Sequence, residues 1–142
     1  MKYLRFALLL SALFALSGCT KYDVDTPDTP SNRAGFSKHI GFDPGEEVSE
    51  VYYYADELGG DVRYQLSFKC NRDIAEKIRT TLSLSPAPQD HFVLAPRDDL
   101  KWWDENSTRD REHWIKVDDK KYYREFWFSE EDGRGFYHEY SS

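Results

Sequence analysis

Cysteine, methionine and positive charge are all scarce in this chain of 142 residues. It has one methionine and two cysteines, Cys19 and Cys70, so it can form at most one internal disulfide. Its 19 Lys and Arg are outnumbered by 26 Asp and Glu, for a formal net charge of −7. This acidic excess argues against a nucleic-acid surface, which needs clustered Lys and Arg, and against a polybasic contact with anionic lipid.

Long apolar runs are lacking as well. A helix that crosses a bilayer needs about 20 consecutive apolar residues. The apolar run at residues 6–16 is roughly half as long. It contains Ser11, is preceded by Lys2 and Arg5, and is followed at once by polar chain. A basic start, a short apolar middle and small residues at the end are typical of a secretory signal peptide.

The segment closes on Leu16-Ser17-Gly18-Cys19. This motif resembles the lipobox of bacterial lipoproteins, in which a leucine and two small residues precede an obligatory cysteine. The resemblance covers residues 1–19 only, and it fills every position of the motif. It implies cleavage between Gly18 and Cys19, acylation of Cys19, and attachment to the membrane through that lipid. Thr20, where some family members have an aspartate, implies an outer-membrane lipoprotein facing the periplasm if the source is Gram-negative.

Behind the signal peptide (1–18), composition divides the chain into two parts. Residues 20–35 have almost no apolar content and contain Pro27 and Pro30, which disfavour a helix. Residues 19–35 are therefore predicted to be a lipidated N-terminus and a flexible tether. Residues 36–142 are predicted to form one domain. Because lipid would occupy Cys19, this domain has no disulfide and depends on its core, to which many of the chain's 23 aromatic residues can contribute.

The first half of the domain shows two strands and a helix. Residues 50–54 are rich in Val and Tyr, and residues 62–69 alternate strictly between apolar and polar. These two segments are predicted to form a hairpin around the turn at residues 58–61. Asn71 is then a candidate N-cap for a helix with an apolar stripe at Ile74, Ala75, Ile78 and Leu82, which ends before Pro86.

The second half is predicted to be an antiparallel meander. Residues 91–95 are a candidate short strand, and residues 96–111 are a long polar loop that contains Trp102 and Trp103. Three strands follow at residues 113–117, 122–129 and 135–140, separated by charged turns. The predicted fold is a single small α+β domain with an antiparallel sheet of about five strands packed on one helix.

Both faces of this meander are expected to be aromatic. The pattern places Phe126 and Phe128 with Phe136 and Tyr140 on one face. The other face is assigned Tyr123, Glu125, Trp127, Tyr137 and Glu139. Either the long loop covers this second face, or the face binds a ligand by stacking and charge. The candidate binding residues are Trp102, Trp103, Tyr123, Glu125, Trp127 and Tyr137.

Other chemistry has less support in the sequence. Glu125 and Glu139 would serve a glycoside hydrolase only if they flanked one cleft. Residues 104–110 have oxygen donors at calcium-loop positions but lack the glycine and the final glutamate of such a loop. The histidines, His39, His91, His113 and His138, are widely scattered and show no zinc-ligand spacing, so they are expected to be surface or satisfied residues. Cys70 is read as a buried structural thiol. No catalytic residue, metal site or cofactor is therefore predicted.

These observations favour a binding protein over an enzyme. The expected role is that of a lipid-anchored, envelope-facing protein that uses an aromatic and acidic surface to bind another protein or an envelope glycan. The alternative is a periplasmic inhibitor or immunity protein against a cationic toxin or lysozyme, which the acidic charge would suit. A hydrolase is the third class. The expected partners are the membrane, through the lipid, and a protein or glycan, but no nucleic acid.

Overall fold

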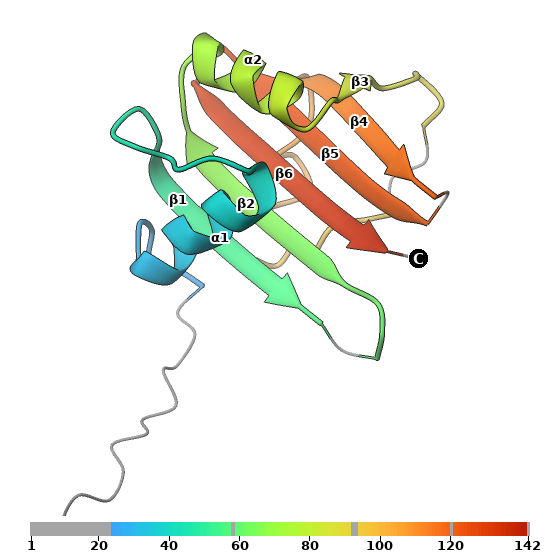
Figure 1. Ribbon diagram of the computed structural model, residues 1–142, viewed down its shortest axis with the longest axis horizontal. Coiled ribbons are helices and arrows are strands. Elements are labelled where there is room, and N and C mark those ends of the chain that lie inside the picture. Colours follow the sequence, from blue (N-terminus) through green and yellow to red (C-terminus); the bar gives the residue numbers. More distant parts are fainter. Residues whose placement is uncertain (1–23, 58, 92–93, 120, 142) are drawn as a thin grey trace, which may run out of the picture.

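One antiparallel sheet organises the domain (Figure 1). The computed structural model describes residues 24–57, 59–91, 94–119 and 121–141. The six strands of the sheet lie in the order β1-β2-β6-β5-β4-β3. The elements are α1 (Pro30–Ile40), β1 (Ser49–Asp56), β2 (Arg63–Lys69), α2 (Arg72–Thr81), β3 (Ser85–Pro86), β4 (Glu112–Asp118), β5 (Tyr122–Ser129) and β6 (Arg134–Ser141). The predicted α+β class and single antiparallel domain are confirmed.

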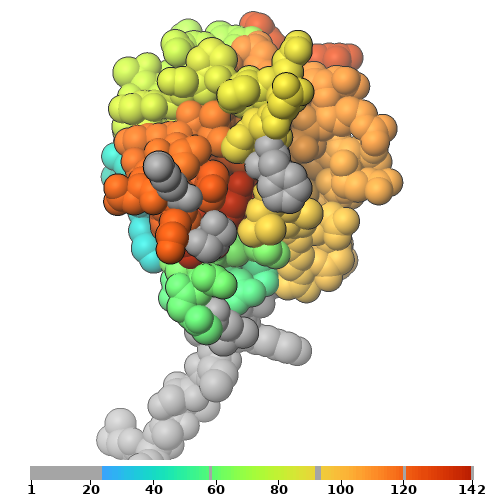
Figure 2. Space-filling model, turned by 90° about the vertical axis from the view of Figure 1, so that its right-hand side faces the viewer, coloured from blue at the N-terminus to red at the C-terminus, as the bar shows by residue number. Residues whose placement is uncertain are grey.

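The domain has three layers. Both helices lie on the same face of the sheet (Figure 1), where Phe36 of α1 and Ile78 of α2 belong to one buried cluster with Phe68 and Phe126. The loop between β3 and β4 covers the opposite face, where Leu100 and Trp103 pack against Trp127 and Phe136. In the edge-on view of Figure 2 the helices lie at the left and this loop, coloured yellow to light orange, at the right.

Hydrogen bonds fasten the loop to the sheet. Gln65 is fully buried on β2, its side-chain amide donates to the backbone oxygen of Arg97 at 2.9 Å, and its oxygen accepts from the Arg97 N–H at 2.9 Å. Trp102 donates its indole N–H to the backbone oxygen of Val24 at 2.7 Å. The loop is thus tied at two places and acts as the third layer, although it has almost no regular structure of its own.

The predicted hairpin, helix and meander all form. β1 pairs with β2, and β4, β5 and β6 follow one another across the sheet. The side chain of Asn71 accepts the Ile74 N–H at 2.9 Å, as expected of the N-cap of α2. The hairpin joins the meander through β2 and β6, with Leu66 opposite Tyr137. Local patterns do not predict that pairing, because it closes a loop of about 70 residues.

The flexible tether predicted for residues 19–35 is wrong for the part that the structure describes. Pro30 occupies the first turn of α1, where its missing N–H costs nothing, and the Thr29 hydroxyl accepts the Asn32 N–H at 3.1 Å. Asn32 is 1 % exposed and donates from its side chain to the backbone oxygens of Thr26 and Val51 at 2.8 and 2.9 Å. Polar composition was misleading because this segment docks through hydrogen bonds as much as through apolar area.

Two further differences concern the segment after α2. Ser85 and Pro86 form β3 opposite Ile115 and Trp114, a two-residue strand that the sequence did not indicate. The short strand predicted at residues 91–95 is not present at residues 91, 94 and 95, while residues 92–93 lie outside the described part. Residues 1–23, with the predicted signal peptide, Gly18 and Cys19, also lie outside it. Among the described residues, no helix has the length and apolar character needed to cross a membrane.

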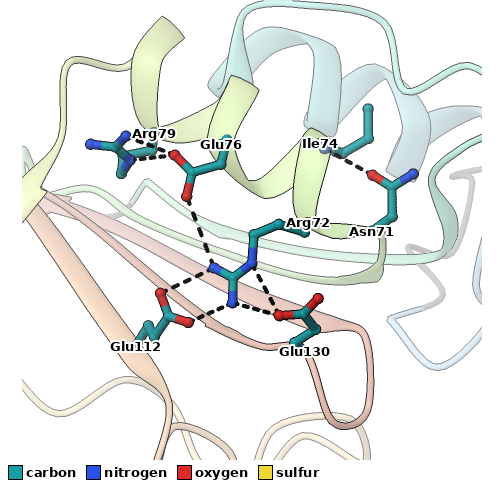
Figure 3. A network of polar contacts seen from close by, with 7 residues as sticks. All are labelled: Asn71, Arg72, Ile74, Glu76, Arg79, Glu112 and Glu130. Atoms are coloured by element: carbon teal, nitrogen blue, oxygen red, sulfur yellow. Dashed lines mark hydrogen bonds and ion pairs between the residues drawn. The ribbon is translucent and has the colours of Figure 1, made fainter.

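Arg72 connects α2 to β4 and to the turn after β5 (Figure 3). Its guanidinium contacts both carboxylate oxygens of Glu112 on β4, at 2.6 and 3.1 Å, and reaches Glu130 in the turn after β5 at 3.1 Å. It also lies over the ring of Phe128 at 5.0 Å from the centroid. Arg72 holds the pKa of Glu112 below its ordinary value. Because these groups are near solvent, the network orients the helix more than it stabilises the domain.

The docking of α1 yields a stability test. We expect Asn32→Ala to lower the free energy of unfolding by about 2 kcal/mol, because two buried carbonyl oxygens lose their donor. Urea titration followed by fluorescence measures the change. Ser31→Ala is the matched control at the exposed neighbouring position, and an equal effect of both substitutions would contradict the docked helix.

Candidate functional site

The register of β5 and β6 decides which side chains share a face of the sheet. Phe126 lies opposite Tyr137, and Glu125 lies opposite His138. Tyr137 and Glu139 therefore face the helices, while Phe136 and Tyr140 face the loop with Trp127. The sequence assignment had β6 reversed, and a one-residue error in register moves every side chain of a strand to the other face.

Glu125 and Glu139 consequently lie on opposite faces of the sheet, and both are buried, at 0 % and 5 % exposure. They do not flank a common cleft, so the paired-carboxylate interpretation is wrong. The two carboxylates lie on the adjacent strands β5 and β6, in chemical surroundings that differ sharply. The difference between the surroundings of Glu125 and Glu139 identifies the candidate site.

Both carboxylate oxygens of Glu139, on the helix face, have polar partners. Its Oε2 accepts from Tyr137 at 2.6 Å and lies 3.0 Å from Nδ1 of His39 on α1. Its Oε1 accepts from the Tyr122 hydroxyl. Burial raises the pKa of Glu139, and these contacts more than offset that effect, so the pKa lies below its ordinary value. This is a satisfied structural network of the kind that buried charges require.

Glu125, on the loop face, lies among three histidines that the sequence separates widely. Nε2 of His91 and Nε2 of His113 lie 3.1 and 3.3 Å from its Oε1, and Nδ1 of His138 lies 3.7 Å from its Oε2. His91 comes from the loop, His113 from β4 and His138 from β6. We call these four residues the His–Glu cluster. The expectation that the histidines are scattered surface or satisfied residues is wrong for three of them.

None of these close approaches is a hydrogen bond. Both carboxylate oxygens of Glu125, both ring nitrogens of His138, and Nε2 of His91 and His113 are buried without a hydrogen-bond partner among the described residues. A buried polar atom left unpaired costs about 1–3 kcal/mol, so native proteins rarely keep several together. A concentration of six such atoms in one place requires a functional explanation.

Aromatic rings wall the cluster. The ring of His113 stacks on Trp127 at 4.5 Å between centroids, and His138 lies 4.5 Å from Tyr140 and 6.3 Å from Trp103. These rings leave little water at Glu125, yet the side chains of His91 and His113 keep 15 % and 21 % of their surface exposed. The polar atoms of the cluster are therefore enclosed, although part of the His91 and His113 side chains reaches the surface.

The electrostatics favour an ionised carboxylate beside a neutral imidazole. Burial raises the pKa of Glu125, but the rings of His113 and His138 more than offset it, so the pKa lies below its ordinary value. For His138, burial lowers the pKa and outweighs the opposing attraction of Glu125. Because no ring nitrogen is aligned to donate to the carboxylate, these shifts reflect proximity and not formed hydrogen bonds. The lone pairs of the cluster stay available.

The structure places most of the predicted binding residues on the loop face. Trp102, Trp103, Tyr123, Glu125 and Trp127 lie there, and Tyr137 lies on the helix face. Trp103 and Trp127 are 1 % and 5 % exposed, because the loop packs Trp103 against Trp127 on the sheet. They are walls of the second core, and they do not present an exposed stacking platform. Trp102 is half-buried and stacks on Tyr52 at 5.5 Å. Glu125 alone was singled out among the four members of the His–Glu cluster.

Cys70 is the other reactive side chain that the sequence identified. It is a free, buried cysteine between β2 and α2, and burial raises the pKa of its thiol to about 12. A thiol is nucleophilic only as the thiolate, so Cys70 is a core residue at neutral pH.

Comparisons with protein-family models, with curated proteins and with solved structures find no match to this chain. With the side chains as they are placed, no group of three or more His, Cys, Asp or Glu among the described residues meets the geometry of a metal site.

The contrast between the two buried carboxylates can be measured. We expect Glu139→Gln to lower the free energy of unfolding by about 2 kcal/mol or more, because hydrogen bonds to a charged group are lost. Glu125→Gln, in buffer with a chelator, should change it by less than about 1 kcal/mol, because no hydrogen bond is lost. Thermal and urea unfolding of both variants provide the comparison. Equal losses would mean that Glu125 is a structural residue like Glu139.

The thiol of Cys70 gives a second prediction. An aromatic disulfide reagent at pH 8 should fail to react with the folded domain, because the thiol is buried and its pKa is about 12. The same reagent should react at once in guanidinium chloride. In a Cys19→Ser background Cys70 is the only thiol, so reaction in the folded state would contradict its assignment to the core.

Proposed function

We propose that this chain is a lipid-anchored binding protein of the bacterial cell envelope, with its ligand site at the His–Glu cluster. The observation that carries the binding role is the group of buried nitrogen and oxygen atoms in that cluster that have no hydrogen-bond partner among the described residues. Atoms left in this state in a core are open to a ligand, whereas the equally buried Glu139 is already satisfied.

The anchor rests on the lipobox-like motif ending at Cys19, and the folded part of the chain begins shortly after it. Val24 already packs against the loop-face core, and Asp25 lies 3.0 Å from Lys101. From Cys19 to Val24 a fully extended chain spans at most about 18 Å. A lipid on Cys19 would hold the domain directly at the membrane surface, much closer than a long flexible tether would.

This close attachment would matter for the ligand. An acidic protein held beside the membrane stays in the envelope, where it meets ligands that enter the periplasm, instead of diffusing away. Two or more acyl chains make such residence effectively permanent, since each buried CH₂ contributes about 0.8 kcal/mol.

The anchor is tested by membrane fractionation. We expect the natural chain to sediment with membranes and to enter the detergent phase on phase separation. Cys19→Ser should leave the protein unacylated and abolish its incorporation of labelled palmitate. Cys70→Ser is the matched control and should leave acylation intact. Labelling that survives Cys19→Ser would overturn the lipoprotein assignment.

A further inference from the structure

The donor types in the His–Glu cluster indicate what it binds. Its unpaired atoms are imidazole nitrogens and carboxylate oxygens, with no hydroxyl, amide or cationic group among them. A sugar or peptide ligand is held by mixed donors and acceptors, whereas nitrogen and carboxylate oxygen atoms that lie close together without hydrogen bonds between them suit a cation. Buried carboxylates are otherwise paired or hydrogen-bonded, as Glu139 is.

The distances between these atoms also suit a metal ion. A tetrahedral zinc ion with bonds of about 2.0–2.1 Å holds its donors roughly 3.3–3.4 Å from one another. Nε2 of His91 and Nε2 of His113 lie 3.1 and 3.3 Å from Oε1 of Glu125. These distances are short enough for hydrogen bonds. The imidazole rings and the carboxylate are nevertheless not aligned to form them. Ligands directed at a common centre have this combination of short separation and poor mutual alignment.

We propose that His91, His113, Glu125 and His138 bind one divalent transition-metal ion of the zinc class. The inference rests on the proposed function and names the ligand of its site. Nδ1 of His138 is 3.7 Å from the carboxylate, so the four side chains do not form a coordination sphere in their present placement. Binding requires small adjustments of these side chains. One of these adjustments is a movement of His91, which lies on the loop.

The ion class follows from the ligands. Imidazole favours Zn²⁺, Cu²⁺, Ni²⁺ and Fe²⁺, whereas Mg²⁺ and Ca²⁺ prefer sites made of oxygen alone. Three imidazoles and one carboxylate fill the four positions of a structural zinc site. The thiol of Cys70 belongs to the helix-face cluster, so it takes no part.

The surroundings also suit a metal centre. The side chains of His91 and His113 are partly exposed, so the cluster lies close to solvent from which an ion could enter. Trp103 and Trp127 shield the opposite side, and an apolar shell strengthens ligand binding by excluding water. Because His91 belongs to the loop and the other ligands belong to the sheet, the ion would clamp the loop onto the sheet. Metal binding is then expected to stabilise the fold.

The experiment uses the full chain in detergent, stripped with a chelator and titrated with Zn²⁺ by calorimetry. We expect one ion per chain, a dissociation constant below about 1 μM, and a rise in melting temperature. Co²⁺ should give the intense visible absorption of a four-coordinate site. Tryptophan fluorescence should change on Co²⁺ binding, because Trp127 stacks on His113. Mg²⁺ should bind at least 100-fold more weakly.

Variants separate this site from adventitious binding. Glu125→Gln and His113→Gln should each weaken Zn²⁺ binding at least tenfold and shift the Co²⁺ spectrum. His39→Gln, a buried histidine of the other face, and Glu112→Gln, at the surface, should bind as the natural chain does. Near-UV circular dichroism verifies folding, and if His39→Gln does not fold, Glu112→Gln remains the control.

Two results would overturn the metal assignment. One is the absence of stoichiometric Zn²⁺ binding by the natural chain, and the other is unchanged binding by the Glu125→Gln/His113→Gln double variant. Either result leaves membrane attachment through Cys19 as a separate question, answered by fractionation. A natural chain that binds Zn²⁺ but incorporates no labelled palmitate would instead refute the anchor and keep the metal site.

Discussion

Gly135 sets the alignment on which both faces of the sheet depend. It lies on β6 between Phe68 of β2 and Phe128 of β5. A Cβ at this position would stand 2.8 Å from the Phe68 ring and 2.9 Å from the Phe126 ring. The two phenylalanines, stacked at 6.2 Å, therefore close over the strand only where it has no side chain. This packing is consistent with one register, and that register directs Glu125 to the loop and Glu139 to the helices.

The two buried carboxylates, Glu139 and Glu125, have very different polar surroundings on the two faces of the sheet. The helix face surrounds Glu139 with phenolic hydroxyls and a histidine that all reach it, and the result is a closed network. The loop face brings imidazoles to Glu125 at similar distances without aligning them. An apolar residue in place of Glu125 would give a more stable core, because unsatisfied buried polar atoms lower the stability of a protein. A role in binding best explains the cluster.

The loop and the N-terminal segment act together on this site. The loop supplies His91 and the covering tryptophans, and Val24 accepts a hydrogen bond from Trp102 of the same loop. Val24 is thus packed against the layer that covers the cluster.

Local patterns determined much of this protein, and tertiary contacts determined the rest. Alternation along residues 62–69, the Asn71 cap and the turns of the meander predicted most strands and α2, because each is a short-range property of the chain. The motif at Cys19 and the acidic charge are likewise recognised from the sequence alone. Docking of α1, the pairing of β2 with β6 and the face of each β6 residue depend on contacts between distant segments. The convergence of His91, His113 and His138 on Glu125 is of the same kind, since no spacing along the chain reports which strands and loops will meet.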